Sequence, residues 1–203
     1  PIAASADDWY DDEKGYFTLY DEDNNELTIM AREMLPEDEY ISSDNKHYFV
    51  KKVDKEGKKA YAEFLGEVEL PEIEEVEAAA ILAAAFQQAQ KGKILLYCTH
   101  SDESYLPSDG KHSIPGKGGI FDVAESFKEA LNKKGIEAVL DKTPHDPHDA
   151  GSYRRSRQTA VNLIRNNMPV AAVFDIHRDA VPKKAYDTQV NGEYMSKIRI
   201  VVG

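Results

Sequence analysis

The sequence predicts an α/β protein in which a mostly parallel sheet with flanking helices follows a small antiparallel β unit. Up to about residue 70, short runs rich in Tyr, Phe, Thr and Ile are separated by turn-forming residues, as in antiparallel strands. From Lys93 onward, apolar runs alternate with segments of helical periodicity, which is typical of a parallel sheet with crossover helices. We therefore divide the chain into a β-rich region, 1–71, a connecting helix, 72–92, and an α/β domain, 93–203.

Composition limits the classes of function. The 203 residues are 41% hydrophobic and 31% charged, which is enough apolar material for a core and indicates a soluble protein. The net charge of −12 disfavours nucleic acid or anionic lipid as the main ligand. No stretch approaches the roughly 20 consecutive apolar residues of a membrane span. A single cysteine excludes an internal disulfide without settling the compartment.

The β-rich region contains two hairpin patterns. The runs GYFTLY and ELTIMA are separated by the turn DEDNN, and YISSDNKHYFVKKV and KKAYAEFLGEVEL flank the turn DKEG. We expect a small antiparallel sheet or barrel over about 15–70, with an acidic surface and no catalytic cluster. His47 lies in one of these strands, where a surface imidazole is the expected role.

After Pro71 the periodicity changes. EIEEVEAAAILAAAFQQAQK predicts a helix with acidic first turns and Lys91-Gly92 at its end, and its alanines indicate close packing against a neighbour. The following segments predict strands at KILLYCT, IEAVLD, PVAAVFDI and KIRIVVG, and helices at GGIFDVAESFKEALNKKG and SYRRSRQTAVNLIRNN.

Two of the predicted strands lead directly into histidines. His100 follows KILLYCT, and His177 follows PVAAVFDI. If these strands are parallel neighbours, both imidazoles emerge at one edge of the sheet, and Glu103 lies in the loop that crosses the same edge. A lone histidine at a strand end is usually structural. Two histidines and a carboxylate on one rim, however, are the three-ligand set of a catalytic zinc site whose fourth position holds water.

Four motifs in this half of the chain, THSDESY, VLDKTPHD, Tyr153-x-x-Ser156-Arg157 and DIHRDA, resemble the stage II sporulation protein P family. These are cell-wall hydrolases of spore-forming bacteria, related to zinc-dependent N-acetylmuramoyl-L-alanine amidases. The resemblance covers about 93–203, with the motifs in family order, and does not extend to residues 1–70. It implies an amidase-like α/β domain that hydrolyses the amide between N-acetylmuramic acid and L-alanine, with cleavage of peptide cross-links as a second activity.

Carried over to this chain, the resemblance makes His100, Glu103 and His177 the zinc ligands. Zinc at this position would polarise an amide carbonyl and lower the pKa of its bound water toward about 7. We predict His177, Arg178 and Asp179 as the catalytic residues.

The sequence leaves two roles open for the residues beside the third ligand, His177. Asp179 or Asp175 could fix an imidazole through its other nitrogen. A local ion pair between Arg178 and Asp179 that holds the loop is the structural alternative.

The chain departs from the family pattern in two places. Cys98-Thr99-His100 stands where the family has His-Thr-His, so Cys98 is either a thiolate ligand or a small buried hydrophobe, which is the commoner role. The family's domain also continues past KIRIVVG, and its general-base glutamate lies in that continuation. We therefore expect a domain truncated at its C-terminus, which could bind zinc yet lack efficient catalysis.

Three further patterns carry alternatives. His145-Asp146-Pro147-His148-Asp149 predicts a structural or substrate loop, with a second metal site as the alternative. Arg154, Arg155 and Arg157 open a helix, where the dipole disfavours them, so they either form core ion pairs or contact a stem-peptide carboxylate. Gly116-Lys117-Gly118-Gly119 lacks the end of a phosphate-binding P-loop and indicates a flexible loop that enters a helix.

We therefore expect a zinc-dependent peptidoglycan hydrolase that acts during sporulation engulfment. The alternatives are a catalytically silent peptidoglycan-binding or scaffolding module and another metallohydrolase, such as a deacetylase. The resemblance also implies sporulation proteins D and M as partners. It implies an extracytoplasmic location, in the intermembrane space of the sporulating cell, with a membrane anchor in a segment absent from this chain.

Overall fold

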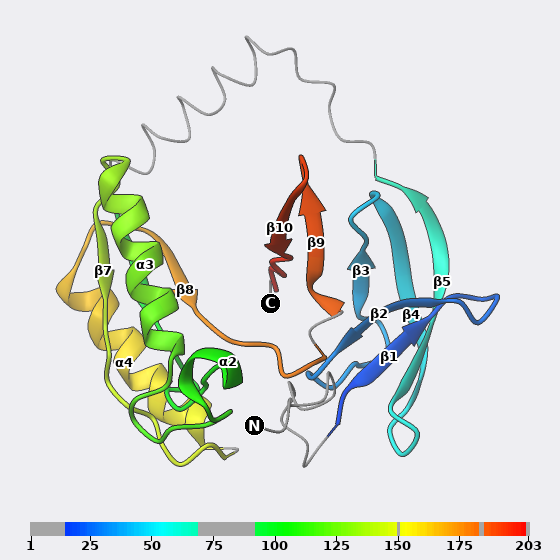
Figure 1. Cartoon of the computed structure of the whole chain (residues 1–203), viewed down its shortest axis with the longest axis horizontal. Helices are drawn as coiled ribbons and strands as arrows, with labels where there is room; N and C mark the ends of the chain where they lie inside the picture. The colour runs from blue at the N-terminus through cyan, green and yellow to red at the C-terminus, as the bar shows by residue number, and fades with distance from the viewer. Residues whose placement is uncertain (1–14, 69–91, 150, 183–184, 202–203) are drawn as a thin grey trace, which may run out of the picture. The chain divides into compact units, whose positions relative to one another are not determined.

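The computed structural model describes residues 15–68, 92–149, 151–182 and 185–201 (Figure 1). The chain divides into two compact units. The mixed-sheet unit consists of Pro1–Pro71 and Asp179–Gly203, and the parallel-sheet unit consists of Glu72–Arg178. Residues 179–203 thus belong to the same unit as the N-terminal strands, whereas we predicted one domain over 93–203. The helix predicted over 72–92 falls almost entirely outside the described residues.

The mixed-sheet unit contains one five-stranded sheet in the order β2-β1-β5-β4-β3. All neighbours are antiparallel except β1 and β5, so the prediction of a purely antiparallel unit is wrong for this pair. Hairpin patterns specify pairing within a hairpin, but they do not determine how two hairpins join. The strands are β1 (Phe17–Tyr20), β2 (Glu26–Met30), β3 (Glu39–Ile41), β4 (Lys46–Asp54) and β5 (Lys59–Glu67).

One face of this sheet forms a separate hydrophobic core, because apolar side chains alternate along its strands. Its buried members are Phe17, Leu19, Met34, Tyr48, Val50, Ala60 and Ala62. His47, on β4, keeps the surface role expected for it, and its ring contacts the carboxylate of Glu39 at 2.8 Å.

The C-terminal segment differs from the prediction. Residues 187–196 form a hairpin of β9 (Asp187–Val190) and β10 (Glu193–Ser196), and its turn, Asn191-Gly192, has positive φ at both positions, as a two-residue hairpin turn requires. The strand predicted at KIRIVVG is wrong over 197–201, which are not in a strand. Ile198 and Ile200 are 89% and 80% exposed, and no strand among the described residues pairs with them. Alternation indicates the capacity to pair, but a strand also needs a partner.

The parallel-sheet unit has three strands in the order β7-β6-β8, all parallel. They are β6 (Lys93–Tyr97), β7 (Ala138–Leu140) and β8 (Val170–Asp175), each within a segment predicted as a strand. Leu95 and Leu96 of the central strand are completely buried, as the continuous apolar run requires. Over the described residues the chain is therefore α/β with one mixed sheet, one parallel sheet and the two-stranded antiparallel sheet of β9 and β10, rather than mostly parallel.

Helices α3 (Ile120–Lys133) and α4 (Ser152–Asn166) occur where the sequence predicts them, and a short helix, α2 (Leu106–Asp109), was not predicted. Helix α3 buries Ile120, Phe121 and Ala124. None of the helices within the described ranges is long and apolar enough to cross a membrane.

Candidate metal centre

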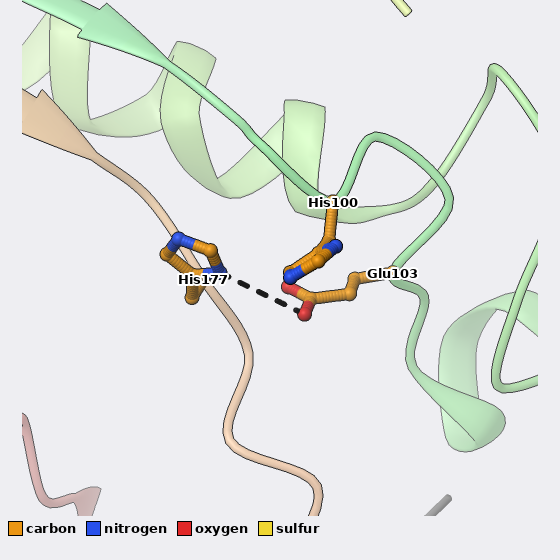
Figure 2. A group of neighbouring side chains, drawn as sticks. All are labelled: His100, Glu103 and His177. Carbon is orange, nitrogen blue, oxygen red and sulfur yellow. Dashed lines mark ion pairs between the residues drawn. The ribbon is translucent and has the colours of Figure 1, made fainter. Parts of the chain in front are cut away.

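The parallel pairing of β6 and β8 brings the predicted ligands together. His100 and Glu103 lie in the loop after β6, where the Glu103 N–H donates to the His100 carbonyl at 3.2 Å, and His177 lies two residues after β8. One possible ligand atom from each of the three residues lies within 4.8 Å of the others (Figure 2). The structure therefore assembles the group that the sequence predicts, entirely within the parallel-sheet unit.

His177 is held by carboxylates on both sides. Its Nε2 lies 3.0 Å from the Asp175 carboxylate, and its Nδ1 lies 3.9 Å from Glu103. Asp175 in turn accepts hydrogen bonds from the backbone N–H and the hydroxyl of Thr99. With Nε2 donating to Asp175, Nδ1 faces the group of three, which is the arrangement that orients metal-binding histidines.

This setting also changes the protonation of His177. Burial lowers the pKa of the imidazole, but hydrogen bonding to Asp175 and Glu103 outweighs burial and raises the pKa to about 10. In the absence of a cation, a proton on His177 thus balances the two carboxylates at neutral pH. A bound metal ion would take the place of that proton.

Glu103 is fixed by the chain around it. The residue is 5% exposed, and its Oε2 accepts a hydrogen bond from the backbone N–H of Arg178 at 2.6 Å. The glycine-rich loop lies against its backbone: a Cβ added at Gly118 would clash with the Glu103 carbonyl oxygen. Close backbone approach therefore explains the glycine, and the loop leads into α3 as expected.

His100 has the properties of a metal-binding imidazole. Burial, together with the nearby charges of His148 and His177, lowers the pKa of its imidazole to about 4, so the ring is neutral at pH 7. Its Nδ1 is buried without a hydrogen-bond partner among the described residues. Buried polar atoms are nearly always satisfied, so a buried nitrogen without a partner in the described part of the chain is consistent with a ligand-binding role for this ring. Two imidazoles and a carboxylate form a donor set that suits zinc and neighbouring divalent metals.

The two histidines of the loop over 145–149 have different roles. His145 is 3% exposed, and its ring nitrogens bond to the Cys98 carbonyl and the Thr159 hydroxyl, both at 2.9 Å, so it is structural. His148 instead stacks on His100, with ring centroids 3.9 Å apart and planes 7° from parallel. No second group of three possible metal ligands lies within the described ranges.

His148 is itself held by a carboxylate, which sequence reasoning missed. Its Nδ1 lies 3.1 Å from Asp102, whose carboxylate also accepts a hydrogen bond from Ser113. Burial raises the pKa of Asp102, but these hydrogen bonds outweigh burial and lower it to about 2. The group of possible metal ligands is therefore flanked by a second carboxylate–imidazole pair.

Cys98 is not part of the ligand group. It is fully buried and packs with Ile120, Phe121 and Ala124 of α3. Burial raises the pKa of its thiol to about 12, so the thiolate form that binds metals is disfavoured. Of the two roles left open by the sequence, the structure favours the small buried hydrophobe.

Arg178 and Asp179, the residues predicted beside the third ligand, belong to different units and make different contacts. Arg178 contributes its backbone N–H to Glu103, as described above. Asp179 belongs to the mixed-sheet unit, where its carboxylate accepts hydrogen bonds from the Ala31 N–H, the Tyr186 hydroxyl and Arg199. It is therefore Asp175 that holds an imidazole, and catalytic roles for Arg178 and Asp179 remain predictions.

The family model of stage II sporulation protein P (SpoIIP) matches residues 10–203. The chain belongs to this family. The match includes the N-terminal strands, to which the resemblance in the motifs did not extend. No curated protein and no solved structure matches the chain. Membership in the stage II sporulation protein P family indicates a sporulation-related role.

Proposed function

We propose that the chain is a zinc-dependent peptidoglycan hydrolase that cleaves the amide between N-acetylmuramic acid and the L-alanine of the stem peptide. The observation that carries this proposal is the group of His100, Glu103 and His177, with ligand atoms within 4.8 Å of one another. When bound, zinc would polarise the amide carbonyl and lower the pKa of a coordinated water. Family membership, the buried unpartnered nitrogen of His100 and the carboxylate behind His177 support it.

The residues in and around the group favour metal binding in different ways. His100 presents a neutral imidazole at neutral pH, because its pKa is lowered to about 4. Asp175 holds Nε2 of His177 and so directs Nδ1 toward Glu103. The Arg178 N–H fixes one oxygen of Glu103. These contacts orient His177 and Glu103 before a cation binds, which reduces the reorganisation that binding requires.

A second candidate is a module that binds metal and peptidoglycan without hydrolysis. The two carboxylates described beside the group are each engaged with an imidazole: Asp175 with His177, and Asp102 with His148. A general base must be able to accept a proton from the attacking water, and these two already stabilise cationic or proton-donating rings. This observation favours the silent module.

Product analysis separates the candidates. Purified peptidoglycan is incubated with zinc-loaded protein, zinc-stripped protein and the Glu103→Gln variant, and the soluble products are identified by mass spectrometry. The amidase releases peptides that begin with L-alanine, only with zinc and only with the parent. Cross-link cleavage or loss of acetyl groups would instead identify an endopeptidase or a deacetylase. Binding to sedimented peptidoglycan without soluble products would establish the silent module.

The cellular setting is part of the same proposal. Peptidoglycan as substrate requires an extracytoplasmic location, and we propose anchoring to the membrane of the sporulating cell. Sporulation proteins D and M are the proposed partners. Co-purification from sporulating cells, with the two proteins depleted in turn, tests the partners, and cell fractionation tests the location.

A further inference from the structure

Helix α4 presents one flank beside the metal centre. Its buried face consists of Ser152, Ser156, Thr159 and Leu163, and the Ser156 hydroxyl lies 2.7 Å from the hydroxyl of Thr99, two residues after β6. Tyr153 and Arg157 are four residues apart, so they are neighbours on the surface of the helix, one turn from each other. Both are exposed and lie outside the buried face.

Tyr153 lies against the metal ligands themselves. Its ring centroid is 5.2 Å from that of His100 and 6.2 Å from that of His177. Nevertheless, 60% of its surface is accessible. An aromatic ring that touches both imidazoles while exposing most of its surface is placed to contact a substrate whose amide reaches the metal.

Arg157 differs from its neighbour Arg155. The Arg155 guanidinium donates to the carbonyls of His145 and Pro147 and pairs with Asp149 at 2.8 Å, so it holds the loop to the helix. This is the acidic compensation expected for arginines that open a helix. No hydrogen bond or ion pair holds Arg157 to any residue in the described ranges. Its guanidinium is therefore available to an external anion.

We propose that Tyr153 and Arg157 form the substrate-binding edge of the metal centre. The ring of Tyr153 packs against the atoms next to the scissile amide, and Arg157 binds a carboxylate of the stem peptide. This inference rests on the proposed function, because the substrate must carry an anionic peptide beside the amide. A guanidinium suits this task, since it binds a carboxylate through two parallel hydrogen bonds.

The test measures binding and does not depend on turnover. The zinc-loaded chain of residues 1–203 is titrated with two disaccharide–peptide fragments, one with free stem-peptide carboxylates and one with these groups amidated. Arg157→Gln should weaken binding of the free-acid fragment about tenfold and leave the amidated fragment unchanged, because one charged hydrogen-bonded pair is lost. Arg165→Gln removes the same charge from an exposed site in the last turn of α4 and should change neither affinity.

Variants of Tyr153 test the other half of the edge. Tyr153→Leu should weaken binding of both fragments by about tenfold, whereas Tyr153→Phe should stay within about twofold of the parent, because the ring makes the contact. Zinc per chain is measured for each variant, and it should equal that of the parent. Retained zinc distinguishes a lost substrate contact from a damaged metal centre.

Several results would overturn the inference. Arg157→Gln and Arg165→Gln could have equal effects, both fragments could lose affinity equally in Arg157→Gln, or the parent could bind neither fragment. Binding that follows the expected pattern without release of peptide would support the substrate-binding edge and contradict the proposed hydrolysis. The two proposals can therefore fail separately.

Discussion

Buried polar side chains distinguish the two units. Every buried polar or charged residue within the described ranges lies in the parallel-sheet unit, whereas the buried side chains of the five-stranded sheet are hydrophobic. These polar residues are Thr99, Ser101, Asp102, Glu103, Ser104, His145, Ser152, Ser156 and Thr159. Burying such groups costs free energy unless each is hydrogen-bonded, so their concentration marks the unit that carries the site.

Strand direction explains the difference. The carboxyl ends of β6 and β8 meet at one edge because the strands are parallel neighbours, so the polar residues after them converge. Antiparallel neighbours, such as β4 and β5, send their ends to opposite edges, and their polar residues form surface turns. The comparison teaches that topology, more than composition, determines where this chain can assemble a metal centre.

The largest expected change in metal affinity follows from Glu103→Gln. The amide oxygen can still accept from the Arg178 N–H, but the carboxylate ligand is lost. We expect zinc affinity to fall more than about 100-fold, because loss of an outer hydrogen-bond partner alone costs about 10–100-fold. A titration against a competing chelator measures this. Glu129→Gln, at an exposed site on α3, is the control, and equal affinities for the two variants would contradict the ligand assignment.

The next largest effect concerns the carboxylate behind His177. Asp175→Asn keeps the shape of the side chain but weakens its hold on Nε2 and removes the charge. We expect zinc affinity to fall about 10–100-fold, with the fold intact by circular dichroism. Asp122→Asn, on the exposed side of α3, should have no effect. An Asp175→Asn variant with parental affinity would show that the imidazole is oriented by something else.

The pH dependence gives a smaller effect of defined sign. The pKa of His177 is raised to about 10, so below that pH a metal ion must displace its proton, whereas the pKa of His100, lowered to about 4, adds no dependence above pH 6. Apparent zinc affinity should rise about tenfold per pH unit between pH 6.5 and 8, with about one proton released per zinc. A flat profile in chelator-competition titrations over this range would rule out a protonated His177.

In the metal-free protein, the raised pKa of His177 lowers folding stability as the pH rises, whereas the apparent zinc affinity increases with pH. Because the pKa of His177 is higher in the folded state than its usual value of 6.5, the contribution is complete below about pH 6.5 and is lost as the pH rises toward 10. Urea unfolding of metal-free protein at several pH values should show this decline. Adding zinc at high pH should reverse it, since the ion binds the folded state.

The smallest effect on metal binding is expected from core substitutions. Cys98→Ala should leave zinc affinity within about twofold of the parent and cost about 1 kcal/mol of folding free energy, because it removes a buried sulfur beside α3. A tenfold loss of zinc affinity, measured by the same titration, would indicate that Cys98 binds the metal as a thiolate.

Leu19→Ala tests whether the two units are distinct. Leu19 is 1% exposed in the core of the five-stranded sheet, so the substitution should lower the free energy of unfolding by about 2–5 kcal/mol. Zinc per folded chain should stay at the parental value. Loss of zinc at temperatures where the parallel-sheet unit remains folded would show that metal binding depends on the mixed-sheet unit.

The sequence predicted those features that depend on local periodicity. The apolar runs of β6 and β8 and the helical spacing of α3 and α4 identified the parallel sheet, and the histidines after two strands led to the group of three possible metal ligands. His148 could not be found in this way, because it reaches His100 through an irregular loop without periodicity. The choice between Asp175 and Asp179 also depended on tertiary structure, since the two carboxylates bond to groups in different units.

The C-terminal segment shows the limits of pattern in both directions. Asn191-Gly192 is a strong hairpin signal, but the flanking strands are polar and exposed, so alternation of apolar residues does not reveal them. KIRIVVG has the alternation of a strand, yet the described residues 197–201 have no pairing partner. Pairing between distant segments is decided by the whole fold, which a local pattern does not contain.

The central claim is that His100, Glu103 and His177 bind one metal ion. It is tested most directly by zinc content after dialysis, measured by elemental analysis for the parent and His177→Ala at pH 7.5. The account predicts about one zinc per parent chain and far less in the variant, with circular dichroism showing both folded. Equal zinc in the two proteins, or none in the parent after zinc is added, would contradict it.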